Sequence, residues 1–155
     1  MTPPLRLVLD TNVVLSALLW EGRPAELLDL GATDRVRLFT SETLLKELRQ
    51  SLGKPKLAKR LQATGLSPHQ HTANYASLAT LVVPSPLPGP VSRDSDDDHV
   101  LACSAAASAD AVVTGDDDLL VLGAHSGIAI LRVSECLDVI AALNPATEDQ
   151  TAAPG

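Results

Sequence analysis

Apolar positions along this chain follow two alternating periods, that of a buried strand and that of an amphipathic helix. Short apolar runs rich in β-forming residues predict strands at 5–10, 35–40, 81–84, 110–116 and 128–133. Apolar residues three or four positions apart predict helices at 11–20, 22–32, 41–52, 54–60, 67–81, 97–109, 117–124 and 134–143. Strands that alternate with helices favour a mostly parallel sheet covered on both faces. The pattern therefore predicts an α/β fold, a three-layer α/β/α sandwich.

Local signals support several of the helix starts. Ser41, Ser67 and Ser134 stand where an N-cap is expected, and Pro24 suits the first turn of its helix. A chain of 155 residues, 45% of them hydrophobic, is long enough for one well-packed domain. We expect that domain to span residues 1–143, and the Pro-, Ala- and acid-containing residues 144–155 to form a disordered tail.

Composition narrows the functional classes. Aromatic residues make up only 2% of the chain, which argues against a platform of exposed rings that stacks single-stranded bases. Cys103 and Cys136 lie in apolar stretches and are interpreted as reduced, buried thiols. The N-terminus runs directly into a strand pattern, and no apolar run is long enough to cross a membrane. We therefore expect a soluble cytoplasmic protein without a membrane partner.

The formal net charge of −7 is unevenly distributed. Residues 1–60 carry ten of the twelve Lys and Arg residues and a net charge of +3, whereas residues 61–155 carry −10. Half of the basic residues fall in one short stretch, namely Lys46, Arg49, Lys54, Lys56, Lys59 and Arg60. This stretch is compatible with binding an RNA phosphate backbone, and equally with an ordinary charged helix surface.

Acidic residues gather where a site is expected. The segment SRDSDDDHV at 92–100 contains Asp94, Asp96, Asp97 and Asp98. In open parallel α/β sheets, sites form beyond the carboxyl ends of the strands. Three acids are placed at that edge and one on the helix after the second strand: Asp10, Asp98, Asp116 and Glu47. Each alone could be a helix cap or a surface charge. Their convergence on one edge favours a functional site.

Crowded carboxylates repel one another unless a cation neutralises them. A site of oxygen ligands suits Mg²⁺ or Mn²⁺ rather than zinc. A calcium loop of the EF-hand type starting at Asp94 fails, because His99 stands where glycine is needed and Ala105 where glutamate is needed. The chain also lacks a P-loop and a nucleophile elbow. The acids therefore predict a site for Mg²⁺ or Mn²⁺.

Four motifs in the same order and spacing resemble the PIN domain. They are LVLDTNVVLSAL, SETLLKEL, RDSDDDHVLACSAAASAD and AVVTGDDDLLVL, and the resemblance covers roughly residues 5–143. It implies a metal-dependent ribonuclease whose acidic quartet, here Asp10, Glu47, Asp98 and Asp116, is catalytic and holds Mg²⁺ or Mn²⁺. By the same resemblance, the supporting positions are Asn12, Thr114 and Asp118. Within the acidic run, we expect Asp97 to support Asp98.

The resemblance also implies a biological role. Many PIN proteins of this size are toxin ribonucleases blocked by a small antitoxin protein, and the fold commonly forms a homodimer. Two other functions stay open: a housekeeping RNA-processing nuclease, and a non-catalytic RNA- or protein-binding module. The presence of all four principal acids weighs against the non-catalytic module.

Overall fold

The computed structural model describes residues 3–85 and 95–143, with Ser95 and Asp96 described by their backbone alone. The predicted tail at 144–155 and Asp94 lie outside the described residues. The strands are β1 (Leu5–Leu9), β2 (Val36–Thr40), β3 (Ala79–Leu81), β4 (Ala111–Val113), β5 (Ala124–His125) and β6 (Ile128–Leu131). The α-helices are α1 (Thr11–Leu19), α2 (Arg23–Ala32), α3 (Glu42–Leu52), α4 (Ala58–Thr64), α5 (Pro68–Leu78), α6 (Ser95–Ala106), α7 (Asp117–Leu120) and α8 (Val133–Leu143), and a short 3₁₀ turn spans Pro55–Leu57.

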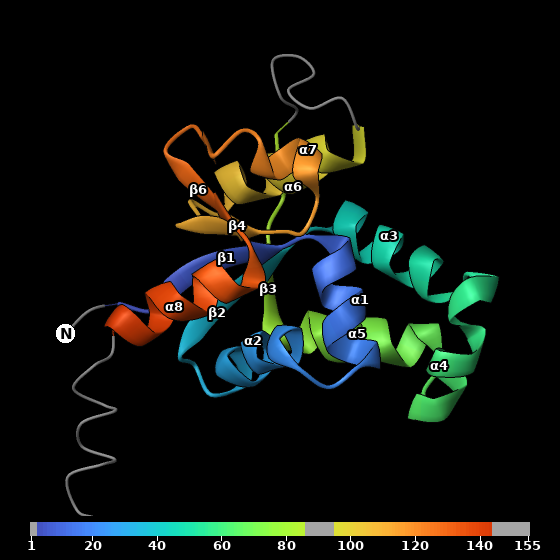
Figure 1. Ribbon diagram of the computed structural model, residues 1–155. Coiled ribbons are helices and arrows are strands. Elements are labelled where there is room, and N and C mark those ends of the chain that lie inside the picture. Colours follow the sequence, from blue (N-terminus) through green and yellow to red (C-terminus); the bar gives the residue numbers. More distant parts are fainter. Residues whose placement is uncertain (1–2, 86–94, 144–155) are drawn as a thin grey trace, which may run out of the picture.

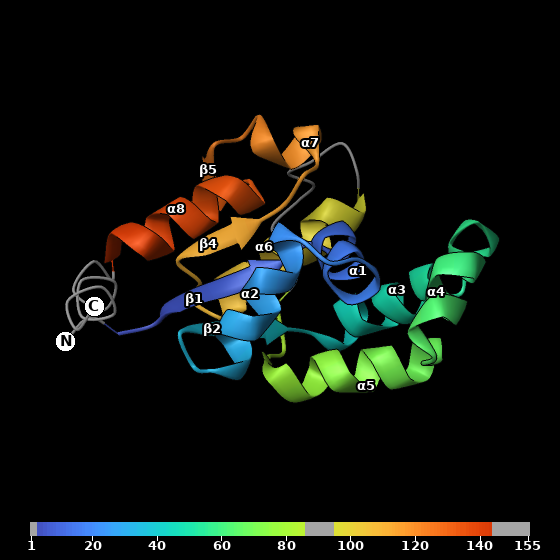
Figure 2. The same ribbon diagram turned by 60° about the horizontal axis from the view of Figure 1, so that its bottom comes forward.

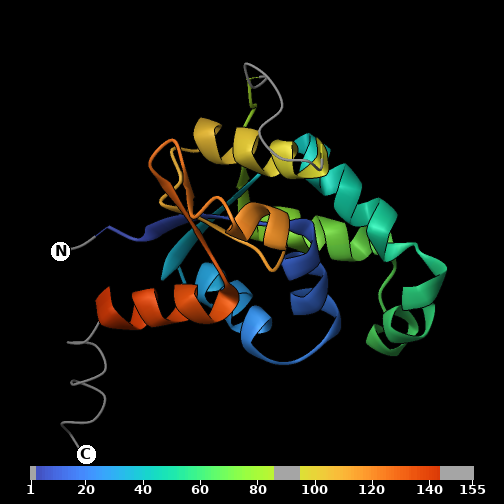
Figure 3. The same cartoon turned by 45° about the horizontal axis from the view of Figure 1, so that its top comes forward.

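The six strands form one sheet in the order β3-β2-β1-β4-β6-β5. All neighbouring strands are parallel except β5, which pairs with β6 in antiparallel register. Helices cover both faces, as Figure 1 shows, so the predicted three-layer α/β/α sandwich is confirmed. Figure 3 shows α6 on one side of the sheet, with α2 and α8 together on the other.

Alternation along the central strands divides the core between the two faces. Leu7 and Leu9 of β1 point toward the face covered by α1, α2, α5 and α8. Val8 points the opposite way and packs against Val100 and Leu101 of α6. All three β1 residues are at most 3% exposed, as expected for a central parallel strand covered on both faces. This two-sided burial fixes the direction and position of the residue that follows the strand.

Helix starts follow the local chemistry in most places. The Ser41 hydroxyl accepts a hydrogen bond from the Leu44 amide, and Ser67 forms a capping box with Gln70. The predicted cap at Ser134 is one residue inside the helix, because α8 already begins at Val133 and the Glu135 carboxylate accepts from the Arg132 amide. Within the described residues, no helix is both long and apolar enough to cross a bilayer.

Two strands differ from the sequence expectation. β3 starts at Ala79, because α5 ends at Leu78 and the chain pairs with β2 at once. β5 was not predicted, and it is only two residues long. Ser126 and Gly127, both at positive φ, turn the chain from β5 into β6, which is the geometry of a tight hairpin.

The order of the strands creates a reversal point in the sheet. From β1, the chain builds outward to β2 and β3 on one side, and to β4, β6 and β5 on the other. The carboxyl ends of β1 and β4 are therefore neighbours at the position where open α/β sheets commonly place their ligand sites. Figure 2 shows α3, α4 and α5 extending to one side of this sheet.

Candidate active site

Asp10 occupies the junction between β1 and α1. Its amide donates a 2.9 Å hydrogen bond to the Val113 carbonyl of β4, and its carbonyl accepts from the amides of Val13 and Val14. The backbone of Asp10 is thus held by the sheet on one side and by the first turn of a helix on the other. Its side chain is only 8% exposed. The fold fixes this carboxylate at the sheet edge, where the sequence predicted it.

Thr114 and Asp116 follow β4 and complete this edge. The Thr114 hydroxyl, fully buried, donates a 2.7 Å hydrogen bond to Oδ2 of Asp10. The Thr114 hydroxyl oxygen itself accepts a hydrogen bond from the Asp116 amide at 3.0 Å. The Asp118 amide in turn donates to Oδ1 of Asp116 at 2.9 Å, so Asp116 caps the short helix α7. Thr114 and Asp118 therefore each donate a hydrogen bond to one of the two acids.

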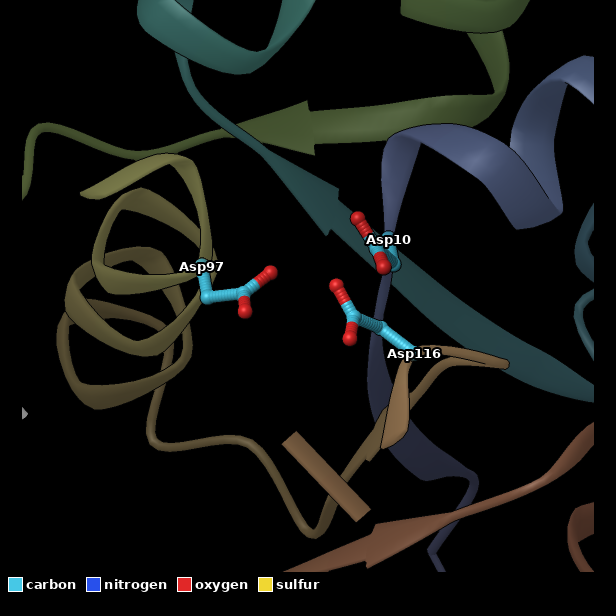
Figure 4. Close-up of side chains that lie close together, drawn as sticks. All are labelled: Asp10, Asp97 and Asp116. Atoms are coloured by element: carbon cyan, nitrogen blue, oxygen red, sulfur yellow. The ribbon is translucent and has the colours of Figure 1, made fainter. Parts of the chain in front are cut away.

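The third carboxylate of the site comes from α6. Oxygens of Asp10, Asp97 and Asp116 all lie within 4.8 Å of one another. Figure 4 shows the three side chains pointing toward a common space from β1, α6 and the segment after β4. Asp97 is 3% exposed, so two of the three acids are buried. We call these three residues the acid cluster.

Asp98 is not part of the acid cluster, although the sequence placed it there and gave Asp97 a supporting position. Consecutive residues of a helix point about 100° apart, so one residue decides which acid faces the sheet edge. Asp97 lies on that side of α6, and Asp98 is partly exposed next to it. The structure thus brings Asp97, and not Asp98, close to Asp10 and Asp116.

Three carboxylates this close repel one another strongly, and burial adds a desolvation cost for each charge. A divalent cation between them would offset both effects. Every potential ligand atom in the acid cluster is a carboxylate oxygen, the type that Mg²⁺ and Mn²⁺ prefer and that zinc favours less than nitrogen or sulfur. The donor set therefore fits a hard divalent ion.

Glu47 lies on α3, outside the acid cluster. It lines a pocket that also includes Asp10, Asp97 and Asp116. Its Oε1 is 2.6 Å from Nδ1 of His99, and its Oε2 is within 3.5 Å of the Thr11 hydroxyl, which donates to it. His99 is on α6, two residues after Asp97, so one helix contributes both an acid and the partner of Glu47. The sequence gave no role to this histidine, because the contact joins residues far apart in the chain.

The pocket beside the acid cluster has a volume of about 300 Å³ and opens to solvent. Besides the acids, its wall includes the exposed side chain of Asn12 and the amine-bearing side chain of Lys54. Two further polar residues of α3, Gln50 and Ser51, also line this pocket. The pocket thus joins an acidic end to a polar and basic rim.

The six basic residues predicted to bind RNA are all exposed. Of the six, Lys54 lines the pocket. Arg60 is engaged elsewhere: its Nε donates to the Leu19 carbonyl, and its guanidinium stacks over the Trp20 ring at 5.6 Å. This contact places a cation at the C-terminal end of α1, where the helix dipole favours it. Lys46, Arg49, Lys56 and Lys59 remain surface residues of α3, the 3₁₀ turn and α4.

The two cysteines are buried and unbonded, as predicted, and take no part in the site. Burial raises the pKa of each thiol to about 11, which keeps both protonated and unreactive near neutral pH.

Comparison with known proteins agrees with the geometry. A sequence model described as the PIN domain matches residues 6–118, a range that includes Asp10, Glu47, Asp97 and Asp116. A relative, the uncharacterized protein MJ1680 of Methanocaldococcus jannaschii, is 33% identical over 119 residues, which cover 76% of this chain and 75% of the relative. PIN domains are generally nucleases, and three clustered carboxylates at the sheet edge can hold a metal ion. On this sequence match and this fold, the chain belongs to the PIN-domain family.

Proposed function

We propose that this protein is a metal-dependent endoribonuclease that hydrolyses RNA phosphodiester bonds. The observation that carries the proposal is the convergence of three carboxylates at the reversal point of a PIN-domain sheet. Their mutual repulsion costs stability, and nothing in the architecture of the sheet requires three acids there. A cation-assisted reaction at this edge explains the arrangement.

In this proposal, Asp10, Asp97 and Asp116 would hold a Mg²⁺ or Mn²⁺ ion. When bound there, the ion would lower the pKa of a water molecule and offset charge on the scissile phosphate. Thr114 keeps Oδ2 of Asp10 in one orientation through its 2.7 Å hydrogen bond, and the Asp118 amide does the same for Asp116. Asp97 takes the place that motif comparison gave to Asp98.

Glu47 is the proposed group that orients the attacking water. Its carboxylate sits in the pocket wall outside the acid cluster, held by His99 and Thr11. A carboxylate in that position can accept a proton from a water lying between it and the acid cluster. Lys54, in the same wall, is placed to contact a phosphate of the bound RNA.

The test compares cleavage of a labelled RNA by the wild type and by single variants in Mn²⁺, in Mg²⁺ and in EDTA. We expect cleavage only with a metal, and a loss of more than about a hundredfold in Asp10→Asn, Asp97→Asn and Asp116→Asn. Asp117→Asn is the matched control, because Asp117 is an exposed acid next to Asp116. Cleavage that survives chelation, or that persists in all three variants, would overturn the proposal. Full loss in Asp98→Asn with activity retained in Asp97→Asn would return the metal site to Asp98.

For the biological role, we propose the toxin component of a cytoplasmic toxin–antitoxin pair, acting as a homodimer. The motif resemblance supports this role. Induced expression should arrest growth, Asp10→Asn should not, and co-expression of an adjacent small gene product should restore growth. Cleavage in vitro without growth arrest would instead favour a housekeeping nuclease.

A further inference from the structure

A second pocket, of about 410 Å³, opens at the same sheet edge beside the acid cluster. Its wall is built from the start of α1, the start of α2, the segment after β4 and the junction of β6 with α8. Asn12 lines both pockets. Thr114, which orients Asp10, and Gly115, which precedes Asp116, also belong to this wall. The two pockets are therefore adjacent parts of one surface.

The charge of this second pocket is opposite to that of the first. Arg23 and Arg132 line it from two different elements, and no acid is among the described residues of its wall. Both arginines are exposed, and within residues 3–85 and 95–143 neither guanidinium forms an ion pair or a hydrogen bond. Two unpaired guanidinium groups on one pocket are suited to bind an oxyanion, and the planar guanidinium matches the geometry of phosphate as well as that of carboxylate.

The starts of two helices add to the positive charge of this second pocket. α2 begins at Arg23 and α8 at Val133, so both helices start in the pocket wall. Figure 3 shows these two helices side by side beneath the sheet. Gly22, which precedes α2, offers no side chain, so no side chain caps the first turn of this helix. The partial positive charge of that helix start favours an anion at the same place as the two arginines.

The rest of the wall is not purely ionic. Val13, Pro24 and Val133 give it an apolar floor, and Ser16 and Ser134 provide hydroxyl groups. A pocket that combines an apolar floor with a few polar groups and an anion site matches a nucleotide, whose base or sugar contacts the floor while its phosphate meets the arginines. A free inorganic anion would make no favourable contact with the apolar residues of the pocket.

We propose that this pocket binds the nucleotide next to the scissile phosphate, with the phosphate of that nucleotide held by Arg23 and Arg132. The inference rests on the proposed ribonuclease function, because it makes this pocket the neighbour of the reacting bond. An RNA strand whose scissile phosphate lies at the acid cluster passes Asn12 and Gly115 to reach this pocket. The arginines then position the substrate, and the acids carry out the chemistry.

The first experiment is a titration of the isotope-labelled full chain with adenosine 5′-monophosphate, without metal, followed by NMR. We expect amide shifts at Ser16, Gly115 and Ser134, and affinity about tenfold weaker in Arg23→Gln and in Arg132→Gln. Arg35→Gln is the matched control, because Arg35 is an exposed arginine that precedes β2 at the opposite edge of the sheet. Adenosine without the phosphate should bind more weakly than the monophosphate. Shifts confined to other residues, or equal affinity in both arginine variants and the wild type, would overturn the subsite.

The second experiment measures RNA cleavage with Mn²⁺. Arg23→Gln and Arg132→Gln should raise KM about tenfold with a smaller change in kcat, and Arg23→Lys should lie between the variant and the wild type. A wild type that binds the nucleotide at this pocket but never cleaves RNA refutes the nuclease and leaves the subsite standing. A wild type that cleaves RNA with KM unchanged in both arginine variants refutes the subsite and leaves the nuclease standing.

Discussion

The hydroxyl of Thr114 donates a 2.7 Å hydrogen bond to Oδ2 of Asp10, and so joins the residues that follow two neighbouring strands, β1 and β4. Both residues are buried, with Thr114 fully inaccessible to solvent. The bond removes one of the orientations that the Asp10 side chain could otherwise adopt. It is therefore a contact that helps to fix the geometry of the acid cluster.

Thr114→Val should reduce RNA cleavage by about 10- to 100-fold, the usual cost of removing a group that orients a metal ligand. Valine keeps the shape of threonine but cannot donate to Asp10 or accept from the Asp116 amide. Thr114→Ser retains the hydroxyl and should keep most of the activity. Steady-state cleavage rates over a range of Mn²⁺ concentrations measure the effect. Equal rates and equal Mn²⁺ dependence in wild type and Thr114→Val would show that this bond does not orient the site.

Asp97→Asn should raise the free energy of unfolding of the metal-free protein. It should also reduce the gain in stability that Mn²⁺ provides. Removing one of three crowded carboxylates relieves repulsion, which raises the free energy of unfolding in EDTA. The wild type should gain about 2.7 kcal/mol at a Mn²⁺ concentration a hundred times the Kd, and the variant should lose that gain. Urea unfolding in EDTA and in Mn²⁺ measures both effects.

The matched variant for this prediction is Asp98→Asn, since the two residues are adjacent on α6 and Asp98 is outside the acid cluster. It should respond to Mn²⁺ as the wild type does. A larger loss of the response in Asp98→Asn than in Asp97→Asn would contradict the assignment of the third ligand.

His71 should make the fold less stable in mild acid. Its side chain is buried, and its Nε2 lies 2.8 Å from the Thr64 hydroxyl, which itself donates to the Leu61 carbonyl. Burial lowers the pKa of His71 below its usual 6.5. Below about pH 6.5 the unfolded chain therefore binds a proton that the folded chain does not, so stability is present above that pH and is lost as pH falls.

Urea unfolding at about pH 7.5 and about pH 5.5 tests this prediction, with an expected contribution from His71 of up to about 1.4 kcal/mol. His71→Gln should show a smaller difference between the two conditions than the wild type. His69→Gln is the control, because His69 is exposed on the same helix. The same pH dependence in all three proteins would assign the acid sensitivity to other groups.

Tyr75→Phe should raise the free energy of unfolding by about 1 kcal/mol. The Tyr75 hydroxyl is buried and has no hydrogen-bond partner among the described residues, while burial raises the pKa of the phenol. Removing the hydroxyl abolishes a desolvation cost and leaves the ring packed in the core. Urea or thermal unfolding measures the change, and RNA cleavage should stay as in the wild type. A clear loss of stability would mean that the hydroxyl is satisfied in solution.

Asp10 and Asp116 could be located from the sequence because each follows a run of apolar residues that can only be a buried strand. Parallel strands place the residues after their carboxyl ends at one edge, so the convergence of these two acids follows from the pattern alone. The same reasoning gave the three layers of the fold. Buried strands and helix caps produce local sequence patterns, and such patterns can be recognised without knowledge of the tertiary structure.

The choice between Asp97 and Asp98 could not be made in this way. It depends on the rotation of α6 about its axis, and one residue changes that rotation by about 100°. The contact of His99 with Glu47, 52 residues apart, and the presence of Arg23 and Arg132 in the wall of one pocket depend on how distant elements pack. β5 escaped prediction because two residues carry too little periodicity to be read as a strand.

The bond between Thr114 and Asp10 spans 104 positions of the chain. During synthesis Asp10 leaves the ribosome long before Thr114 and Asp116 do, and the pairing of β1 with β4 has to wait for the later segment. The acid cluster therefore cannot assemble on a nascent chain that stops short of β4. Under the proposed function, the protein would have no complete metal site until most of its chain has been made.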